Sequence, residues 1–365
     1  MVESPSPLAD AAPIRVSAEP VWRVGWDETG PVFENIVAGA LLGDGRAAIA
    51  DGGQTLQVSV LAHDGAVLAV LGRPGQGPGE FRRILAMKRL GTDTIAVQDA
   101  DNRRLSLFHG GELVDNVALG PAANLSLLGA DEEGRAVFGM PPGVVYGRRY
   151  ETPWLAIPFV RMSLATGAVD TLAVADWDQS LEYGGNSPFL SQGHATIAGG
   201  TVVVGRGDAP EVRWLGADGE PVRIARWEAP SSPVPDSLWT AYERALRDRF
   251  TEIGLPAADI DGRLTTMKAA IQEPLPHFED LLADPEGNLW IAEYTPRYVG
   301  DPPRVRDHPE RFYLLDPEGR GMGHVSLPPG AALRILDIGA DRMLAVEEDS
   351  LGVQAVALYA LNKQR

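Results

Sequence analysis

The segment GRPGQGPGEFRRILAMKRLGTDTIAVQDADNRRLSLF, residues 72–108, decides the fold of this chain. Its first part, residues 72–81, is too rich in Gly and Pro for a helix or a strand and predicts a shaped loop. The runs that follow are apolar or alternating, and short turns separate them. Strands are expected at 84–90, 94–97, 104–108 and 113–119. The segment therefore predicts a unit of four antiparallel strands.

Two stretches of this segment carry a family resemblance. GQGPGEF at 75–81 and DADNRRLSLF at 99–108 resemble the NHL-type repeat, which has a Gly-rich start and an Asp…Asn-x-Arg-aliphatic-x-aliphatic-Phe stretch. The resemblance implies a six-bladed β-propeller, a fold whose members differ widely in function. It also implies that Asp99 can pair with Arg104.

The rest of the chain repeats this unit with a period of about 40 residues, which is typical of a propeller or array. Six units follow one another, and the first turn of each contains Gly or Asp. These turns lie at Gly45, Asp93, Gly134, Gly200, Gly287 and Asp341. The sixth unit lacks one strand, and the extended runs 14–16 and 21–24 can supply it, which would close the ring and remove exposed sheet edges. We expect a disordered tether at 1–12 and one propeller over 13–365.

Composition limits the partners of this chain. Its 50 acidic and 32 basic side chains give a net charge of −18, which disfavours nucleic acid and anionic membrane surfaces. There is no Cys, and no apolar run is long enough to span a bilayer. The first residues look like a processed or truncated Pro/Ser/Ala tether, so on the analogy with the family we expect a periplasmic or extracellular protein.

The long connections are expected on one face of the disc, because every first and third turn of a unit is short. They span 140–159, 175–192, 228–276 and 294–311. The longest contains a predicted helical hairpin at about 230–275, between blades four and five, with helices near 238–250 and 261–271. We expect the hairpin to cover the channel mouth, and long loops of this kind are usually functional.

A row of residues, five of the six charged, is expected at the same face, six positions after each first turn. The row consists of Asp51, Asp99, Met140, Arg206, Glu293 and Glu347. The acids can ring the channel mouth and recruit a cation such as calcium, or each can cap its own turn or pair with a nearby Arg. Glu293 and Glu347 have no Arg at matching spacing, so they are the better ligand candidates.

Other candidate ligand residues lie on the first strands and in the loops. His194 and His277 can face the channel, where they can line a wet tunnel or contribute to a divalent metal site. The loops combine aromatic residues with Arg, a mixture favoured at binding surfaces. Members of this set are Tyr146, Arg148, Tyr294 and Arg297.

Two functions remain open. The first is a binding or interaction module that holds a protein, peptide, glycan or small molecule on its loop-decorated face without catalysis. The alternative is a metal-dependent hydrolase of the lactonase or esterase kind, or a lyase, acting at the channel mouth. No Gly-x-Ser-x-Gly elbow and no phosphate loop occur in the sequence.

Overall fold

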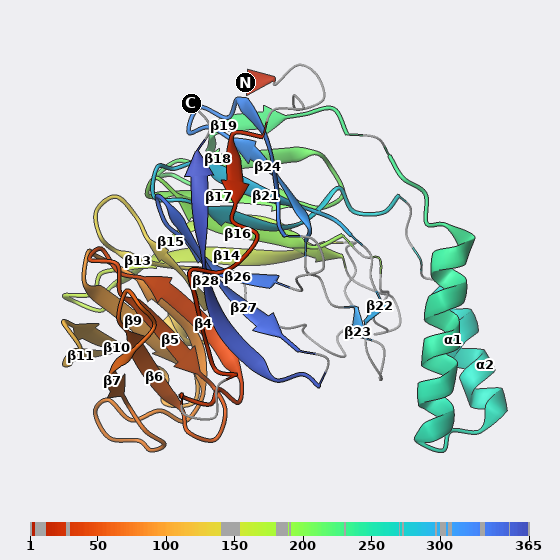
Figure 1. Ribbon diagram of the computed structural model, residues 1–365. Helices are drawn as coiled ribbons and strands as arrows, with labels where there is room; N and C mark the ends of the chain where they lie inside the picture. Colours follow the sequence, from red (N-terminus) through yellow and green to blue (C-terminus); the bar gives the residue numbers. More distant parts are fainter. Residues whose placement is uncertain are drawn as a thin grey trace.

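The chain folds into six antiparallel sheets arranged around a common axis (Figure 1). The structure is a computed structural model. It describes residues 2–3, 12–26, 30–139, 154–179, 189, 191–229, 231–269, 271, 274–295, 298–299, 304–305, 309–328, 333–349 and 351–363. The predicted six-bladed β-propeller is confirmed.

Blades one to five each have four strands in chain order from the axis outwards, and blade six has three that follow this order. Blade one has β4 (Ile36–Leu41), β5 (Ala47–Asp51), β6 (Gln57–Leu61) and β7 (Val67–Leu71). Blade two has β8 (Ile84–Arg89), β9 (Thr94–Asp99), β10 (Arg104–His109) and β11 (Glu112–Ala118). After a short 3-10 helix, Gly120–Asn124, blade three has β12 (Ser126–Ala130), β13 (Ala136–Gly139), β14 (Trp154–Met162) and β15 (Val169–Gln179).

The second half of the ring repeats this order. Blade four has β16 (Gly193–Ala198), β17 (Thr201–Arg206), β18 (Glu211–Leu215) and β19 (Pro221–Arg226). Blade five has β20 (Phe278–Ala283), β21 (Leu289–Glu293), β24 (Arg311–Leu315) and β25 (Gly321–Ser326). Between β21 and β24 lies a small pair, β22 (Tyr298–Val299) with β23 (Arg304–Val305). Blade six has β26 (Leu333–Ile338), β27 (Arg342–Glu348) and β28 (Gln354–Lys363).

The N-terminal part of the chain completes blade six, as predicted. β2 (Ile14–Val16) and β3 (Trp22–Val24) both pair antiparallel with β28. The two ends of the chain are thus joined in one sheet, and the exposed edge of an open array disappears. A further short strand, β1 (Val2–Glu3), pairs in parallel with β19 of blade four.

The core lies between the blades, because each blade buries both of its faces. In β10, Leu105 and Leu107 pack in the cluster shared with blade three, whereas Phe108 packs in the cluster shared with blade one. Successive side chains of a strand point to opposite faces, so both sets of positions are apolar. Ser106, on the same face of β10 as Phe108, is buried as well.

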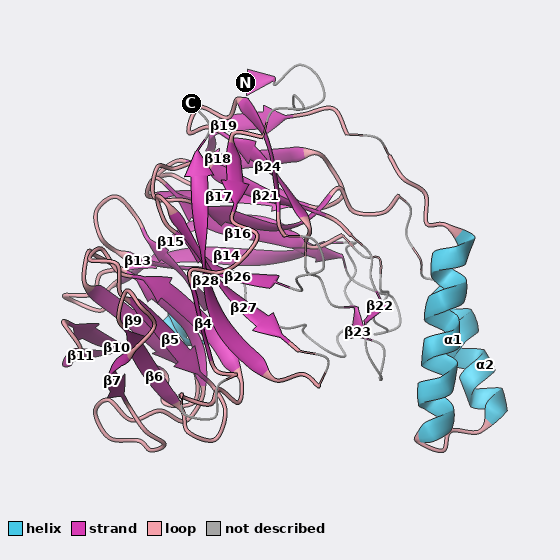
Figure 2. Cartoon of the chain, viewed as in Figure 1, coloured by secondary structure: helices cyan, strands magenta, loops and turns pink. Residues whose placement is uncertain are grey.

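The predicted helical hairpin is present between blades four and five. α1 (Asp236–Glu252) follows Pro235, and α2 (Ala257–Ala269) follows Pro256, four residues before the expected start of the second helix. Proline is well suited to this place because its fixed φ suits a helix start and it lacks only an amide that would be unpaired. The hairpin stands beside the disc on the side of β22 and β23 (Figures 1 and 2).

The hairpin has a small apolar cluster of its own. Trp239 and Tyr242 of α1 are buried with Phe189, a residue of the connection between blades three and four. The rings of Phe189 and Tyr242 lie 5.9 Å apart, and those of Trp239 and Tyr242 lie 5.8 Å apart. Two long connections of the decorated face are therefore packed together.

Candidate functional site

The charged row expected at the ends of the second strands lies on one side of the ring. Each residue pairs with the start of the innermost strand of its blade, as in Asp51 with Ile36 and Glu293 with Phe278. Asp99, Arg206 and Glu347 occupy the same place in blades two, four and six. The long connections leave the sheets here. Met140, Tyr146, Arg148 and Arg297 fall outside the described residues.

Asp51 and Asp99 cap the start of their own blades. Asp51 accepts backbone N–H groups from Glu34, Asn35 and Gly53 at 2.9 to 3.0 Å. Asp99 is fully buried and accepts the corresponding amides of its blade, those of Arg82, Arg83 and Asn102. Both residues therefore follow the alternative in which each acid caps its own turn.

The family resemblance implied an ion pair between Arg104 and Asp99. In the structure, the Arg104 side chain binds other groups. Its guanidinium donates to the backbone carbonyls of Gln76, Gly77 and Glu80. These carbonyls belong to the Gly-rich loop at 72–81. The Arg therefore holds the loop that starts the blade, which explains why the loop and the Arg occur together in the sequence.

Glu347 is held by the strand that closes the ring. Nε and Nη2 of Arg23, in β3, donate to its two carboxylate oxygens, and the Tyr359 hydroxyl donates to Oε1. The Glu347 side chain is 8% exposed. The pKa of Arg23 is raised, chiefly by its hydrogen bond to this carboxylate. The partner that was not visible at short spacing comes from the other end of the chain.

Arg206 and His277 both lie at the junction of blades four and five. Nη2 of Arg206 lies 3.2 Å from Oδ2 of Asp208, and the side chains are 38% and 27% exposed. The backbone of Gly207 accepts the amide of His277 at 2.7 Å, so the blade-five residue is fixed beside this turn. Burial lowers the pKa of His277, and the nearby Asp208 carboxylate partly offsets that effect.

His194 lies at the same junction. It is on β16, and its ring centroid is 5.5 Å from that of Phe278, the first residue of β20. Burial lowers the pKa of His194 to about 4, because an imidazolium would lose its hydration there. The side chain is therefore a neutral imidazole at neutral pH.

Glu293 completes the group at the start of blade five. Its side chain is 35% exposed, Oε2 lies 3.9 Å from Nε of Arg311, and Oε1 accepts the Tyr313 hydroxyl at 3.4 Å. Glu293 pairs with Phe278 in blade five, and the ring of Phe278 contacts that of His194 in blade four. Tyr294 follows it and is half-buried. The structure thus gathers Arg206, His194, His277, Glu293 and Tyr294, whereas Asp51 and Glu347 belong to blades one and six.

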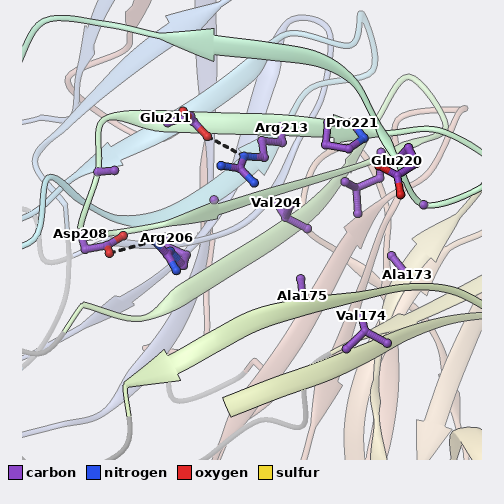
Figure 3. Close-up of a pocket in the computed structure, with 14 residues that line it drawn as sticks. Ala173, Val174, Ala175, Val204, Arg206, Asp208, Glu211, Arg213, Glu220 and Pro221 are labelled. Carbon is purple, nitrogen blue, oxygen red and sulfur yellow. Dashed lines mark hydrogen bonds and ion pairs between the residues drawn. The ribbon is translucent and has the colours of Figure 1, made fainter. Parts of the chain in front are cut away.

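Sequence reasoning missed a cavity beside this group, between blades three and four (Figure 3). Its volume is about 580 Å³. Ala173 and Ala175 of β15 face Val204 across it, and the ion pairs Arg206–Asp208 and Arg213–Glu211 lie along its blade-four side. The only sequence signal for this cavity was the spacing of Arg206 and Asp208 across a turn of blade four. The small side chains that leave the space come from blade three, so the sequence did not connect them with that turn.

Metal ligands and membrane helices were searched for in the described part of the chain. There, no group of three or more His, Asp or Glu residues is arranged to hold a metal ion. None of the described helices is long and apolar enough to cross a membrane.

Comparison with known proteins supports the fold. Neither protein-family models nor curated proteins match the sequence. A solved structure from Bacteroides fragilis, described as a "Putative exported protein", matches with a TM-score of 0.55 and 12% identity over 100% of this chain and 99% of its own. A member of the DUF4221 family from Bacteroides vulgatus matches with a TM-score of 0.55 and 10% identity over 96% and 99%. The protein is a six-bladed β-propeller that resembles these two structures in fold.

Proposed function

We propose that this propeller is an extracytoplasmic binding protein whose loop-decorated face holds a protein, peptide, glycan or small-molecule ligand without chemical conversion. The binding group is the junction of blades four and five, formed by Arg206, Asp208, His277, Glu293 and Tyr294. Beside it lie the cavity between blades three and four and the α1–α2 hairpin.

One observation carries this proposal. Oδ1 of Asp208 is buried and has no hydrogen-bond partner among the described residues, although its other oxygen pairs with Arg206. A buried acceptor without a partner costs free energy, and such groups in native proteins call for a ligand, an ion or a water. Its position at the edge of a cavity favours a bound ligand that donates a hydrogen bond.

The chemistry of the neighbouring side chains supports the same conclusion. Arg206 and Glu293 are 38% and 35% exposed and carry opposite charges. Partly exposed Arg, Tyr and carboxylate groups next to an apolar surface can orient a polar ligand and shield it from water. The extracytoplasmic location is proposed on the analogy with the structural neighbour from Bacteroides fragilis, and fractionation of the native host tests it.

The experiment measures thermal unfolding with purified probes: a hexapeptide mixture, an oligosaccharide mixture and δ-gluconolactone. A probe that binds the native state raises Tm by an amount set by its concentration relative to Kd. The variants Arg206→Ala and Glu293→Gln should raise the Kd of the probe at least fivefold, which reduces the Tm shift at a given probe concentration. Arg320→Ala, which removes an exposed ion pair with Asp316 in an outer turn, is the matched control and should leave it unchanged.

The result can also reject the proposal. Binding that persists in both variants would place the ligand elsewhere. The lactone or a nitrophenyl ester could instead be turned over in a reaction that depends on added calcium or zinc and is lost in Glu293→Gln. That result would show that the protein is the metal-dependent hydrolase and not a binding protein. Metal content of protein purified without chelator, measured by elemental mass spectrometry, accompanies the assay.

A further inference from the structure

The cavity between blades three and four is a groove that follows the strands beside it (Figure 3). Three alternate residues of β18, namely Glu211, Arg213 and Leu215, line its blade-four side. Alternate residues share one face of a strand, so the groove runs along β18 for about 13 Å. Asp208 lies at one end and Gly219 at the other. A groove of this kind has the shape of an extended peptide segment.

The opposite wall of the groove is the edge of β15, the outermost strand of blade three. β15 pairs with β14 on one side, and no described strand pairs with its other side. Ala173, Val174 and Ala175 all line the groove. One face of a strand would offer only alternate residues. The three consecutive residues therefore indicate that the groove also borders the edge of β15.

Pro158 determines which backbone groups of β15 point to that edge. It lies opposite Val174 in the register of β14 and β15. Pro has no N–H to donate, so it fits a pair that is not hydrogen-bonded. A residue in such a pair directs its own N–H and C=O away from the partner strand. The N–H and C=O of Val174 are therefore directed to the free edge, and outside the sheet neither has a backbone partner among the described residues.

Gly219 gives a second indication that this edge faces blade four. It lies in the turn that follows β18 and has a φ of +81°. A Cβ at this position would collide with the backbone carbonyl oxygen of Leu172 in β15. The turn of blade four thus lies against the backbone of β15 at this end of the groove.

The other end of the groove carries a hydrogen-bond acceptor that the protein does not use. Oδ1 of Asp208 is buried without a partner in the described part of the chain, while Oδ2 pairs with Arg206. A cationic donor would supply the missing hydrogen bond. The charges of the lining allow this addition, because three carboxylates face two guanidinium groups: Asp208, Glu211 and Glu220 against Arg206 and Arg213.

We propose that the ligand of the decorated face is an extended peptide that adds to β15 as a fifth strand and places a Lys or Arg side chain on Oδ1 of Asp208. Its backbone would pair with the N–H and C=O of Val174, and its small apolar side chains would lie against Ala175 and Val204. Strand addition takes its affinity from main-chain hydrogen bonds and its specificity from side-chain pockets. The proposal rests on the proposed function and narrows its ligand to one class.

Thermal unfolding with three synthetic hexapeptide libraries tests the proposal. The first library has Lys at its third position, the second has Glu there, and the third is the Lys library with an N-methylated backbone. A library that binds the native protein raises Tm. Wild-type protein should bind the Lys library with at least fivefold lower apparent Kd than either of the others. Hydrogen exchange at the amides of 172–176 should slow at least fivefold when the Lys library is present.

Two variants separate the backbone contact from the charged contact. Val174→Pro removes the edge N–H, which β14 does not use, so the variant should fold and bind the Lys library at least tenfold more weakly. Val174→Thr keeps the amide and the branched shape, and as the matched control it should change Kd less than twofold. Asp208→Asn should abolish the preference for Lys over Glu. If Val174→Pro does not fold, Ala175→Leu, which fills the groove, must weaken binding at least fivefold.

The outcomes distinguish this proposal from the function on which it rests. Equal binding of the N-methylated library, or unchanged binding in Val174→Pro, would overturn strand addition and leave a binding protein. Equal binding of the Glu library would overturn the contact with Asp208. A Tm shift with oligosaccharides or the lactone alone, lost in Arg206→Ala, would reject a peptide ligand but support the proposed function. No shift with any probe would reject both.

Discussion

Arg23 donates two hydrogen bonds to Glu347, from Nε to Oε2 at 2.5 Å and from Nη2 to Oε1 at 3.0 Å. The two residues lie in β3 and β27, and β28 separates these strands in the sheet of blade six. The ion pair therefore crosses the strand at which the two ends of the chain meet. It adds a charged contact to the backbone pairing that closes the ring.

Removal of the Arg from this pair should destabilise the whole propeller. Arg23→Ala leaves the Glu347 carboxylate, 8% exposed, with the Tyr359 hydroxyl alone. Loss of one partner of a buried pair costs 3 to 5 kcal/mol; because Arg23 is 35% exposed, we expect about 2 kcal/mol. Urea unfolding followed by Trp fluorescence measures it. A loss no larger than that of Arg320→Ala, which removes an exposed ion pair, would contradict the role in closure.

The two Glu residues that share a place in blades five and six should behave differently. Glu347→Gln should lower the free energy of unfolding by about 2 kcal/mol, because it breaks a buried charged hydrogen-bond pair. Glu293→Gln should lower it by less than about 0.5 kcal/mol, since this carboxylate is 35% exposed and 3.9 Å from its Arg. Denaturant curves of the two variants decide this. Equal losses would show that Glu293 is structural as well.

Asp99 should be among the most important polar side chains of blade two. Asp99→Ala leaves the amides of Arg82, Arg83 and Asn102 without their acceptor in a buried place. We expect a loss of about 3 kcal/mol in unfolding free energy. Asp101→Ala removes an exposed ion pair two residues away and should cost less than about 1 kcal/mol. Similar losses in the two variants would be inconsistent with capping by Asp99.

His194 should make the stability of the protein depend on pH. Its pKa is about 4 in the folded state against 6.5 in the unfolded chain. Between these values the unfolded chain binds more protons, so stability falls as the pH falls from 6.5 to 4, by about 3 kcal/mol at most. His194→Gln should lose this part of the pH dependence, whereas His63→Gln, at an exposed turn, should keep it. Unfolding free energies at pH 4.5 and 7 provide the comparison.

Phe189 should anchor the helical hairpin without supporting the ring. It is 1% exposed and packs on Tyr242. Phe189→Ala should cost about 3 kcal/mol locally, which is roughly a hundredfold in the opening equilibrium of α1 and α2. Limited trypsin digestion should then cut the hairpin at least tenfold faster, with the Tm of the propeller unchanged. Digestion at the wild-type rate, as expected for the exposed Leu351→Ala, would contradict the anchoring.

Local patterns in the sequence were sufficient for the fold. Residues 72–108 contain strands and turns that repeat around the ring, and the missing last strand pointed to the runs at 14–16 and 21–24. The start of α2 was missed by four residues, because the apolar spacing that marked the helix begins after its first turn. Strands and turns are recognised from the pattern of residues that are close together in the chain. A single sequence was therefore sufficient to predict them.

The roles of the site residues depended on contacts between distant segments. Spacing treated Glu293 and Glu347 alike, and only the closed ring brought Arg23 to one of them across 324 positions. Likewise, the ring of Phe278 in blade five contacts that of His194 in blade four, and the cavity beside the short turns is lined by all six blades. The blades and the closure of the ring could be predicted from the sequence, because local periodicity encodes them. Which charges are paired, buried or open to a ligand was decided by the packing of blades that are far apart in the chain.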